Sequence, residues 1–233
     1  MYDEVDMENN IENRFKMVFD SSTFKRIADT YDTYTKRVLD MGCGFGEYMQ
    51  RFGKDSVGIT TTQAEVEYGK AHGIDLRFGN VELLEKTLQP TEAFDMFWGN
   101  NLFEHLLSPH AFLVHLKKYA KDDAILILGV PMVPKIASLT KLKKFRGSLA
   151  SPHINFFTKE TFRLTAERAG WRVLDVRSFA VGSKVLDHAS SMLAPHLYLI
   201  AKNDPSYRYP EKKLKEWEDD THYASVIDTM AGR

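Results

Sequence analysis

The sequence has a single cysteine, Cys43, among 233 residues, so no disulfide can form within one chain. Long hydrophobic runs are also lacking, because the most apolar stretch, AILILGVPMV at 124–133, is too short to span a bilayer and contains a proline. Neither charge sign is in excess: 31 lysines and arginines are balanced by 32 acidic residues, which gives no basic field for nucleic acid. The first residues, MYDEVDMENNIENRFK, are acidic and polar, unlike a signal peptide. We therefore expect a cytoplasmic protein with no transmembrane segment and no nucleic-acid partner.

Short apolar runs alternate with stretches of helical periodicity along most of the chain. The expected strands lie at 37–41, 56–60, 74–80, 93–100, 124–130, 171–180 and 196–202. The expected helices between them lie at 47–53, 62–73, 110–120 and 159–170, and a looser insert occupies 181–194. This alternation indicates an α/β fold with a mostly parallel sheet and right-handed crossovers. We divide the chain into a helical cap at 1–35, one catalytic domain at 36–202 and a charged tail at 203–233.

Three glycines follow the first expected strand in VLDMGCGFGEYMQ at 38–50. A dinucleotide-binding fingerprint needs its third glycine at position 47, where this sequence has Glu47. The pattern is instead Asp40-x-Gly42-x-Gly44-x-Gly46, which resembles motif I of the class I methyltransferases that use S-adenosylmethionine (SAM). Glycines tolerate positive φ and have no Cβ, so the backbone of such a loop can lie along a ligand.

The resemblance extends over nearly all of residues 36–202. The stretch AFDMFWGNNLFEHLLSPHAFLVHLKKYAKDDAILILGVP resembles the family's fourth strand, a Glu-His pair, a helix and the fifth strand. HINFFTKETFRLTAERAGW at 153–171 resembles a bacterial subgroup that methylates small molecules and cell-surface glycans. The resemblance implies a Rossmann-like sheet of seven mostly parallel strands with an antiparallel last strand and helices on both faces. It also implies SAM as the cofactor and methyl transfer as the activity.

The same resemblance assigns residues to SAM. It places Asp40 near the ammonium group of the cofactor, the three glycines of motif I along its amino-acid part, and Gly99 and Asn100 beside it. Thr60 stands where many relatives have an acidic residue that binds both ribose hydroxyls, and Thr61 or Gln63 could share that contact. A hydroxyl makes one such hydrogen bond but not the charge-assisted pair. Asn80 stands where an Asp often accepts from the adenine amino group, and the backbone N–H of Val81 could meet the ring.

Two histidines are candidates for proton transfer, because imidazole titrates near neutral pH. His105 follows the fourth strand and either acts as a base or supports the structure and the cofactor. His153 ends the long connection after the fifth strand and serves as a base, a substrate contact or a loop anchor. The other histidines have no comparable context and are interpreted as surface or packing residues, and no clustered metal-ligand pattern is evident.

The acceptor is the least determined part. The long connection contains a basic run that consists of Lys135, Lys141, Lys143, Lys144 and Arg146. These side chains either are simply exposed to solvent or bind an anionic substrate. We expect methylation, at oxygen, of a small or carrier-linked metabolite such as a sugar of a cell-surface glycan or natural product. A lipid or quinone precursor is the alternative and RNA comes third. A domain that binds SAM without catalysis is the alternative from another class.

Overall fold

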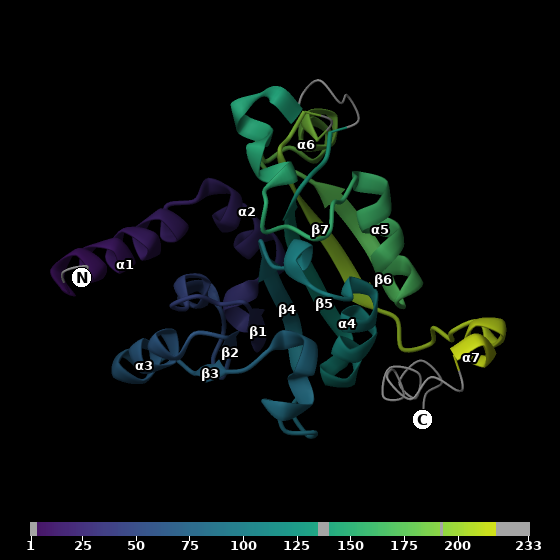
Figure 1. The fold of residues 1–233 in the computed structure, drawn as a ribbon, viewed down its shortest axis with the longest axis horizontal. Coiled ribbons are helices and arrows are strands. Elements are labelled where there is room, and N and C mark those ends of the chain that lie inside the picture. Colours follow the sequence, from purple (N-terminus) through teal and green to yellow (C-terminus); the bar gives the residue numbers. More distant parts are fainter. Residues whose placement is uncertain (1–3, 135–139, 192, 218–233) are drawn as a thin grey trace.

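The computed structural model describes residues 4–134, 140–191 and 193–217, except for the side chains of 4–9, 144, 146, 216 and 217. One seven-stranded sheet in the order β3-β2-β1-β4-β5-β7-β6 runs through it (Figure 1). Its strands are β1 (Val38–Met41), β2 (Val57–Thr60), β3 (Leu76–Phe78), β4 (Phe94–Asn100), β5 (Ala120–Pro131), β6 (Trp171–Arg177) and β7 (His196–Asn203). Only β7 is antiparallel to its neighbours, β5 and β6, and the other neighbouring pairs are parallel. The predicted fold class is confirmed.

Helices cover both faces of this sheet, with α4 and α5 on one side and α2 on the other (Figure 1). The α-helices are α1 (Glu4–Phe19), α2 (Ser22–Tyr31), α3 (Gln63–His72), α4 (Pro109–Leu116), α5 (Lys159–Arg168), α6 (Lys184–Ser190) and α7 (Glu211–Trp217). Short 3₁₀ turns complete the connections: η1 (Thr33–Thr35), η2 (Glu47–Arg51), η3 (Val81–Lys86), η4 (Phe103–His105), η5 (Lys117–Tyr119) and η7 (Lys143–Leu149). None of the described helices is long and apolar enough to cross a membrane.

Three elements differ from the sequence prediction. The helix expected at 47–53 is a 3₁₀ segment, η2, which ends at Arg51, because the backbone N–H of Gly53 donates to the carbonyls of residues 33 and 36 instead of continuing a helix. Strand β5 begins at Ala120 rather than at 124, since Ala120 pairs with Phe94 of β4 ahead of a shift in register. The looser insert contains α6, which is held by the buried carboxylate of Asp187: its oxygens accept from the backbone N–H groups of residues 181 and 182.

An aromatic cluster fixes α2 against the sheet. The ring of Phe24 lies 4.8 Å from that of Tyr48 and 5.1 Å from that of Trp98, centroid to centroid. Both Phe24 and Trp98 are fully buried, and Tyr198 of β7 stacks on the other side of Trp98 at 6.0 Å. On the opposite face the indole N–H of Trp171 donates to the carbonyl of Leu113 at 2.9 Å, which joins β6 to α4. These contacts join α2 and η2 to β4 and β7 on one face of the sheet, and α4 to β6 on the other.

The segments outside the sheet dock onto it. In α1, Arg14 forms an ion pair with Glu47 at 2.6 Å, so this helix contacts the loop after β1. Beyond β7, Lys117 donates to the carbonyl of Asp204 at 2.8 Å, and Leu214 of α7 packs against the core. The end of the expected tail, 218–233, lies outside the described residues.

We expect Phe24→Ala to lower the free energy of unfolding by about 3–5 kcal/mol, because the substitution leaves a cavity among buried aromatic rings. Urea denaturation followed by circular dichroism measures the change. The control is Met17→Ala in α1, whose side chain is 67% exposed and whose loss should stay within about 0.5 kcal/mol. Equal losses in the two variants would contradict the packing of α2 described above.

Candidate active site

The loop after β1 is shaped by its glycines. Gly42, Gly44 and Gly46 have φ values of +73°, +57° and +88°, a region that other L-residues seldom adopt. A Cβ on Gly44 would lie 2.8 Å from a carboxylate oxygen of Glu47 and 2.9 Å from the guanidinium of Arg14. The backbone N–H of Gly42 donates to the carbonyl of Ile59 in β2 at 2.9 Å, which ties the loop to the sheet. A ligand can therefore approach this backbone closely.

Asp40, near the end of β1, places a carboxyl group beside this loop. Its side chain is buried, and among the described residues its Oδ2 has no hydrogen-bond partner. Burial, followed by the nearby charge of Glu47, raises the pKa of Asp40 well above its usual value. A buried carboxylate without a partner is costly, and a cation placed beside it would remove that cost. The site thus fits the ammonium group of the methionine part of SAM.

Asn100, at the end of β4, faces the same loop. Its side-chain N–H donates to the hydroxyl of Tyr48 at 2.8 Å, whereas its Oδ1 has no partner among the described residues. Burial and the charge of Asp40 raise the pKa of Tyr48 to about 12, so this phenol stays protonated. Asp40 and Asn100 therefore offer two buried acceptors to one ligand, from neighbouring strands.

Thr60 is placed as predicted at the end of β2, but its hydroxyl is already engaged. It donates to the carboxylate of Glu65 in α3 and accepts from the backbone N–H of Thr62 at 3.1 Å. Thr61 and Gln63 are exposed. Glu65, in the first turn of α3, thus places a carboxylate beside the end of β2. The sequence analysis did not name Glu65. Its position, five residues after Thr60 and within an expected helix, would have allowed it to be proposed as a neighbour of Thr60.

Asn80 caps η3, where its Oδ1 accepts from the backbone N–H of Glu82 at 2.9 Å. The adjoining Val81 is buried against the core. The carboxylate of Glu82 accepts in turn from the backbone N–H groups of residues 107 and 108, at 3.0 and 2.9 Å. The Oδ1 atom of Asn80 has a second lone pair, with which it can accept another hydrogen bond.

The structure brings the two candidate histidines together around a third residue, Glu104. The Nε2 atoms of His105 and His153 lie 4.0 and 3.9 Å from Oε1 of Glu104, and the two imidazole rings meet edge to face with centroids 4.8 Å apart. Glu104 is 1% exposed, and neither carboxylate oxygen has a hydrogen-bond partner among the described residues. Its backbone carbonyl accepts from Ile154 and Asn155 at 3.1 and 3.0 Å, which fixes the segment that carries His153.

The electrostatics of this cluster suit proton transfer. Burial raises the pKa of Glu104, partly offset by the charge of His105. Burial, followed by the charge of His105, lowers the pKa of His153, so this imidazole is neutral at pH 7 and can accept a proton. The three residues could also ligate a cation, with donor atoms up to 4.8 Å apart. Around a tetrahedral zinc ion with bonds of about 2.0–2.1 Å, ligand atoms lie about 3.4 Å apart, so the cluster would have to contract.

A further histidine reaches the site, one that the sequence analysis took for a surface or packing residue. The Nε2 atom of His196, at the start of β7, lies 3.0 Å from Oδ1 of Asn101, and burial lowers the pKa of His196 to about 4. Asn101 has a φ of +53°, next to Asn100. Gly129 of β5 makes this convergence possible, since a Cβ there would lie 2.4 Å from Asn100 and 2.8 Å from His196.

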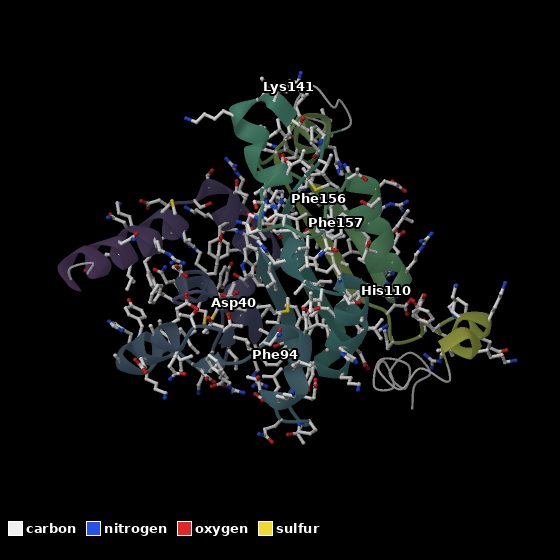
Figure 2. All side chains as sticks on the ribbon, in the orientation of Figure 1. Asp40, Phe94, His110, Lys141, Phe156 and Phe157 are labelled. Carbon is white, nitrogen blue, oxygen red and sulfur yellow. The ribbon has the colours of Figure 1, made fainter. Side chains whose placement is uncertain are left out.

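The basic run lies apart from the glycine loop. Lys141 stands at the upper end of the molecule in Figure 2, well away from Asp40, and Lys143 is exposed. Lys135 and the side chains of Lys144 and Arg146 lie outside the described residues. Phe157, which follows the His153 segment, is buried against Phe103 at 5.1 Å.

The fold and site define a class of protein. The family model for a methyltransferase domain matches residues 12–176, more than half of the chain, and the chain belongs to this family. Its fold is that of the class I methyltransferases, whose methyl donor is SAM.

Curated relatives match parts of the chain. The ubiquinone biosynthesis O-methyltransferase of Maricaulis maris is 33% identical over 101 residues, or 39% of this chain and 39% of that protein. A probable chloroplastic tocopherol O-methyltransferase of Oryza sativa is 26% identical over 132 residues, or 52% of this chain and 36% of that protein. The matches thus span less than two-fifths of the length of these relatives.

Solved structures agree on the fold. The chain superposes on a SAM-dependent methyltransferase from Clostridium acetobutylicum with a TM-score of 0.62 and 10% identity, covering 85% of this chain and 99% of that one. A TehB-like SAM-dependent methyltransferase from Corynebacterium glutamicum gives a TM-score of 0.57 and 16% identity, covering 87% and 100%.

We expect Glu65→Ala to weaken SAM binding by about tenfold or more, because it removes a charged acceptor of hydrogen bonds worth about 1.5–3 kcal/mol. Thr60→Val should have a smaller effect, since Thr60 only orients the carboxylate. Isothermal titration calorimetry with SAM measures both. The control is Glu67→Ala, an exposed carboxylate on the same helix. Wild-type affinity in Glu65→Ala would instead assign the ribose contact to Thr61 or Gln63.

Proposed function

We propose that the chain transfers a methyl group from SAM to an oxygen atom of a small or carrier-linked acceptor. The observation that carries this proposal is the pair of buried carboxylates, Asp40 and Glu104, at one edge of the sheet; Oδ2 of Asp40 and both oxygens of Glu104 have no hydrogen-bond partner among the described residues. The first lies beside a glycine loop and suits a cationic cofactor. The second lies between two imidazoles and suits proton removal from the acceptor. A domain that only binds SAM would have no use for the second.

The chain's own residues divide the binding of the cofactor. When bound, SAM supplies a methyl group on a positively charged sulfur. Asp40 accepts from the cofactor's ammonium group, Asn100 offers a second acceptor, and Glu65, oriented by Thr60, binds the ribose hydroxyls. Asn80 and the backbone of Val81 meet the adenine. The positive φ values of the glycines at 42, 44 and 46 shape the loop along which the cofactor lies, and Gly99 of β4 lies beside it.

On the acceptor side, His153 takes the hydroxyl proton and Glu104 stabilises the imidazolium that forms. A carboxylate at 3.9 Å in a buried setting favours the charged imidazole, which makes the proton transfer less costly. His105 supports this arrangement: its Nδ1 lies 3.2 Å from the carbonyl of Pro152, next to His153.

The relatives' names bear on the acceptor. Those named for ubiquinone biosynthesis and for tocopherol support a hydroxyl of a quinone precursor or similar lipid more than the sugar hydroxyl that the HINFFT segment suggests. The basic run gives weaker support to an anionic acceptor, because Lys141 lies far from Asp40 (Figure 2).

We expect the purified chain to bind SAM in the micromolar range, about −8 kcal/mol, and to release S-adenosylhomocysteine when an acceptor is present. Calorimetry measures the first, and transfer of radiolabelled methyl to extract fractions measures the second. Gly44→Val serves as the negative control, because a side chain there collides with Glu47 and Arg14. Binding without transfer to any fraction would favour the non-catalytic alternative, and no binding would contradict the proposal.

We expect His153→Ala to lower kcat by about 100-fold while SAM affinity stays nearly unchanged, because a general base acts only in the chemical step. The lowered pKa of His153 adds a second readout: kcat should rise with pH through a midpoint below 6.5 and then level off, and His153→Ala should lose that rise. His72→Ala, in the exposed end of α3, is the control. Normal turnover in His153→Ala would leave His105, or no base, as the better account.

A further inference from the structure

Glu104, His105 and His153 form a cluster in which each residue offers one atom that can ligate a metal ion. These three atoms lie within 4.8 Å of one another. Three points no more than 4.8 Å apart fit inside a sphere with a radius of about 2.8 Å, so one ion can lie within that distance of all three. Bonds from zinc to nitrogen or oxygen are about 2.0–2.2 Å long. Shifts of about 0.7 Å in each side chain therefore bring all three atoms to bonding distance.

The carboxylate of Glu104 lacks the donors that a buried carboxylate normally has. Glu104 is 1% exposed, and within the described part of the chain neither side-chain oxygen has a hydrogen-bond partner. The Nε2 atoms of His153 and His105, at 3.9 and 4.0 Å from Oε1, are too distant for hydrogen bonds. A buried charge is costly unless it is paired or coordinates a metal. An ion between the carboxylate and the two imidazoles would remove that cost.

The two imidazoles are held in orientations that suit ligation. Nδ1 of His105 lies 3.2 Å from the carbonyl of Pro152, and the ring of His153 is hydrogen-bonded to the backbone of Gly147. A carbonyl only accepts, so Nδ1 of His105 carries a proton, and in the neutral ring Nε2 keeps a lone pair on the side of Glu104. Histidines that ligate metals almost always donate their other ring N–H to a carbonyl, a carboxylate or water in this way.

The backbone that carries these side chains is fixed by hydrogen bonds. The carbonyl of Glu104 accepts from the backbone N–H groups of Ile154 and Asn155 at 3.1 and 3.0 Å. The side-chain N–H of Asn155 donates to the carbonyl of Leu106 at 2.6 Å. The turn η4, with two of the ligands, is thus joined to the segment that carries the third, His153.

The donor set indicates the kind of ion. Imidazole suits zinc, copper, nickel and iron, whereas magnesium and calcium prefer oxygen ligands. The side chain of His105 is 39% exposed, so water can reach the cluster and serve as a fourth ligand. Three protein ligands and one open position are typical of zinc sites that are not purely structural.

We propose that Glu104, His105 and His153 bind one divalent transition-metal ion, such as zinc, and that the bound ion inhibits methyl transfer. A nitrogen lone pair that coordinates an ion cannot accept a proton, so His153 acts as the base only in the metal-free chain. The effect on turnover rests on the proposed function, whereas the binding of the ion does not.

Isothermal titration calorimetry of the untagged full chain with zinc chloride tests the site. We expect one ion per chain with a micromolar Kd. Glu104→Gln, His105→Ala and His153→Ala should each weaken binding by about tenfold or more, because even the loss of an outer-shell partner costs 10–100-fold. The matched control is His188→Ala: this imidazole also lies beside a carboxylate, 2.9 Å from Asp175, but outside the cluster, so its loss should leave the zinc affinity unchanged.

Thermal melting with and without zinc gives a second readout. An ion that binds only the folded chain raises its Tm, so zinc should raise the Tm of the wild type and of His188→Ala but not that of the cluster variants. The melts without zinc show whether each variant is folded, and His105→Ala, whose side chain is partly exposed, is the reference if the buried Glu104→Gln is unstable. Absence of zinc binding to the wild type, or unchanged zinc affinity in His105→Ala, would overturn the site.

Transfer of radiolabelled methyl to an accepting extract fraction, at saturating SAM, tests the consequence. Zinc should lower the rate about tenfold or more, and EDTA should restore it. Undiminished transfer by the zinc-bound chain would overturn the inhibition. Zinc binding at the cluster in a chain that transfers no methyl group would leave the metal site standing and remove the proposed function, whereas methyl transfer by a chain that binds no zinc would do the reverse.

Discussion

The burial of Asp40 is the constraint on which the rest of the site depends. A carboxylate taken out of water without a partner is strongly disfavoured, and the neighbouring Glu47 adds to the cost by repulsion. The fold tolerates this arrangement because β1 lies in the middle of the sheet, between β2 and β4, and its packing is supported by the aromatic cluster under α2. The site is therefore electrostatically incomplete until a cation enters. That incompleteness is a reason for affinity toward a cationic cofactor.

Glu104, on the side proposed for the methyl acceptor, is likewise a buried carboxylate. Its backbone carbonyl holds the segment with His153, so the position of the imidazole is set by main-chain hydrogen bonds. Its carboxylate is left without donors among the described residues and faces two imidazoles. One residue thus anchors a loop with its backbone and supplies charge with its side chain. A change in the loop after β5 would be transmitted directly to the proposed base.

Close packing at the carboxyl edge of the sheet brings the end of β4 and the start of β7 together across β5. Gly129 has no side chain, which lets Asn100 and His196 approach each other across β5. Asn100 contacts Tyr48, which follows the glycine loop, and the neighbouring Asn101 contacts His196 at 3.0 Å. The proposed sites of the cofactor and of the methyl acceptor therefore share one edge, as is usual for ligand sites in open α/β sheets.

The sequence alone determined the elements whose signals are local. The spacing of Asp40, Gly42, Gly44 and Gly46 predicted the loop after β1, since only glycine adopts those φ values readily, and hydrophobic alternation predicted the strands. The sequence did not reveal that Gly53 would bond to residues 33 and 36 and so end η2, or that Asp187 would organise α6.

Only the tertiary structure decided which distant groups meet. Glu65 takes the hydroxyl of Thr60 because α3 turns its first carboxylate back over the end of β2. His196 reaches Asn101, 95 positions away, because β7 inserts between β5 and β6. The contact of Glu104 with His153 likewise depends on where the long connection folds back. Such pairings are set by strand order and by the packing of helices on the sheet. Neither produces a periodic pattern in the sequence from which the pairing could be predicted.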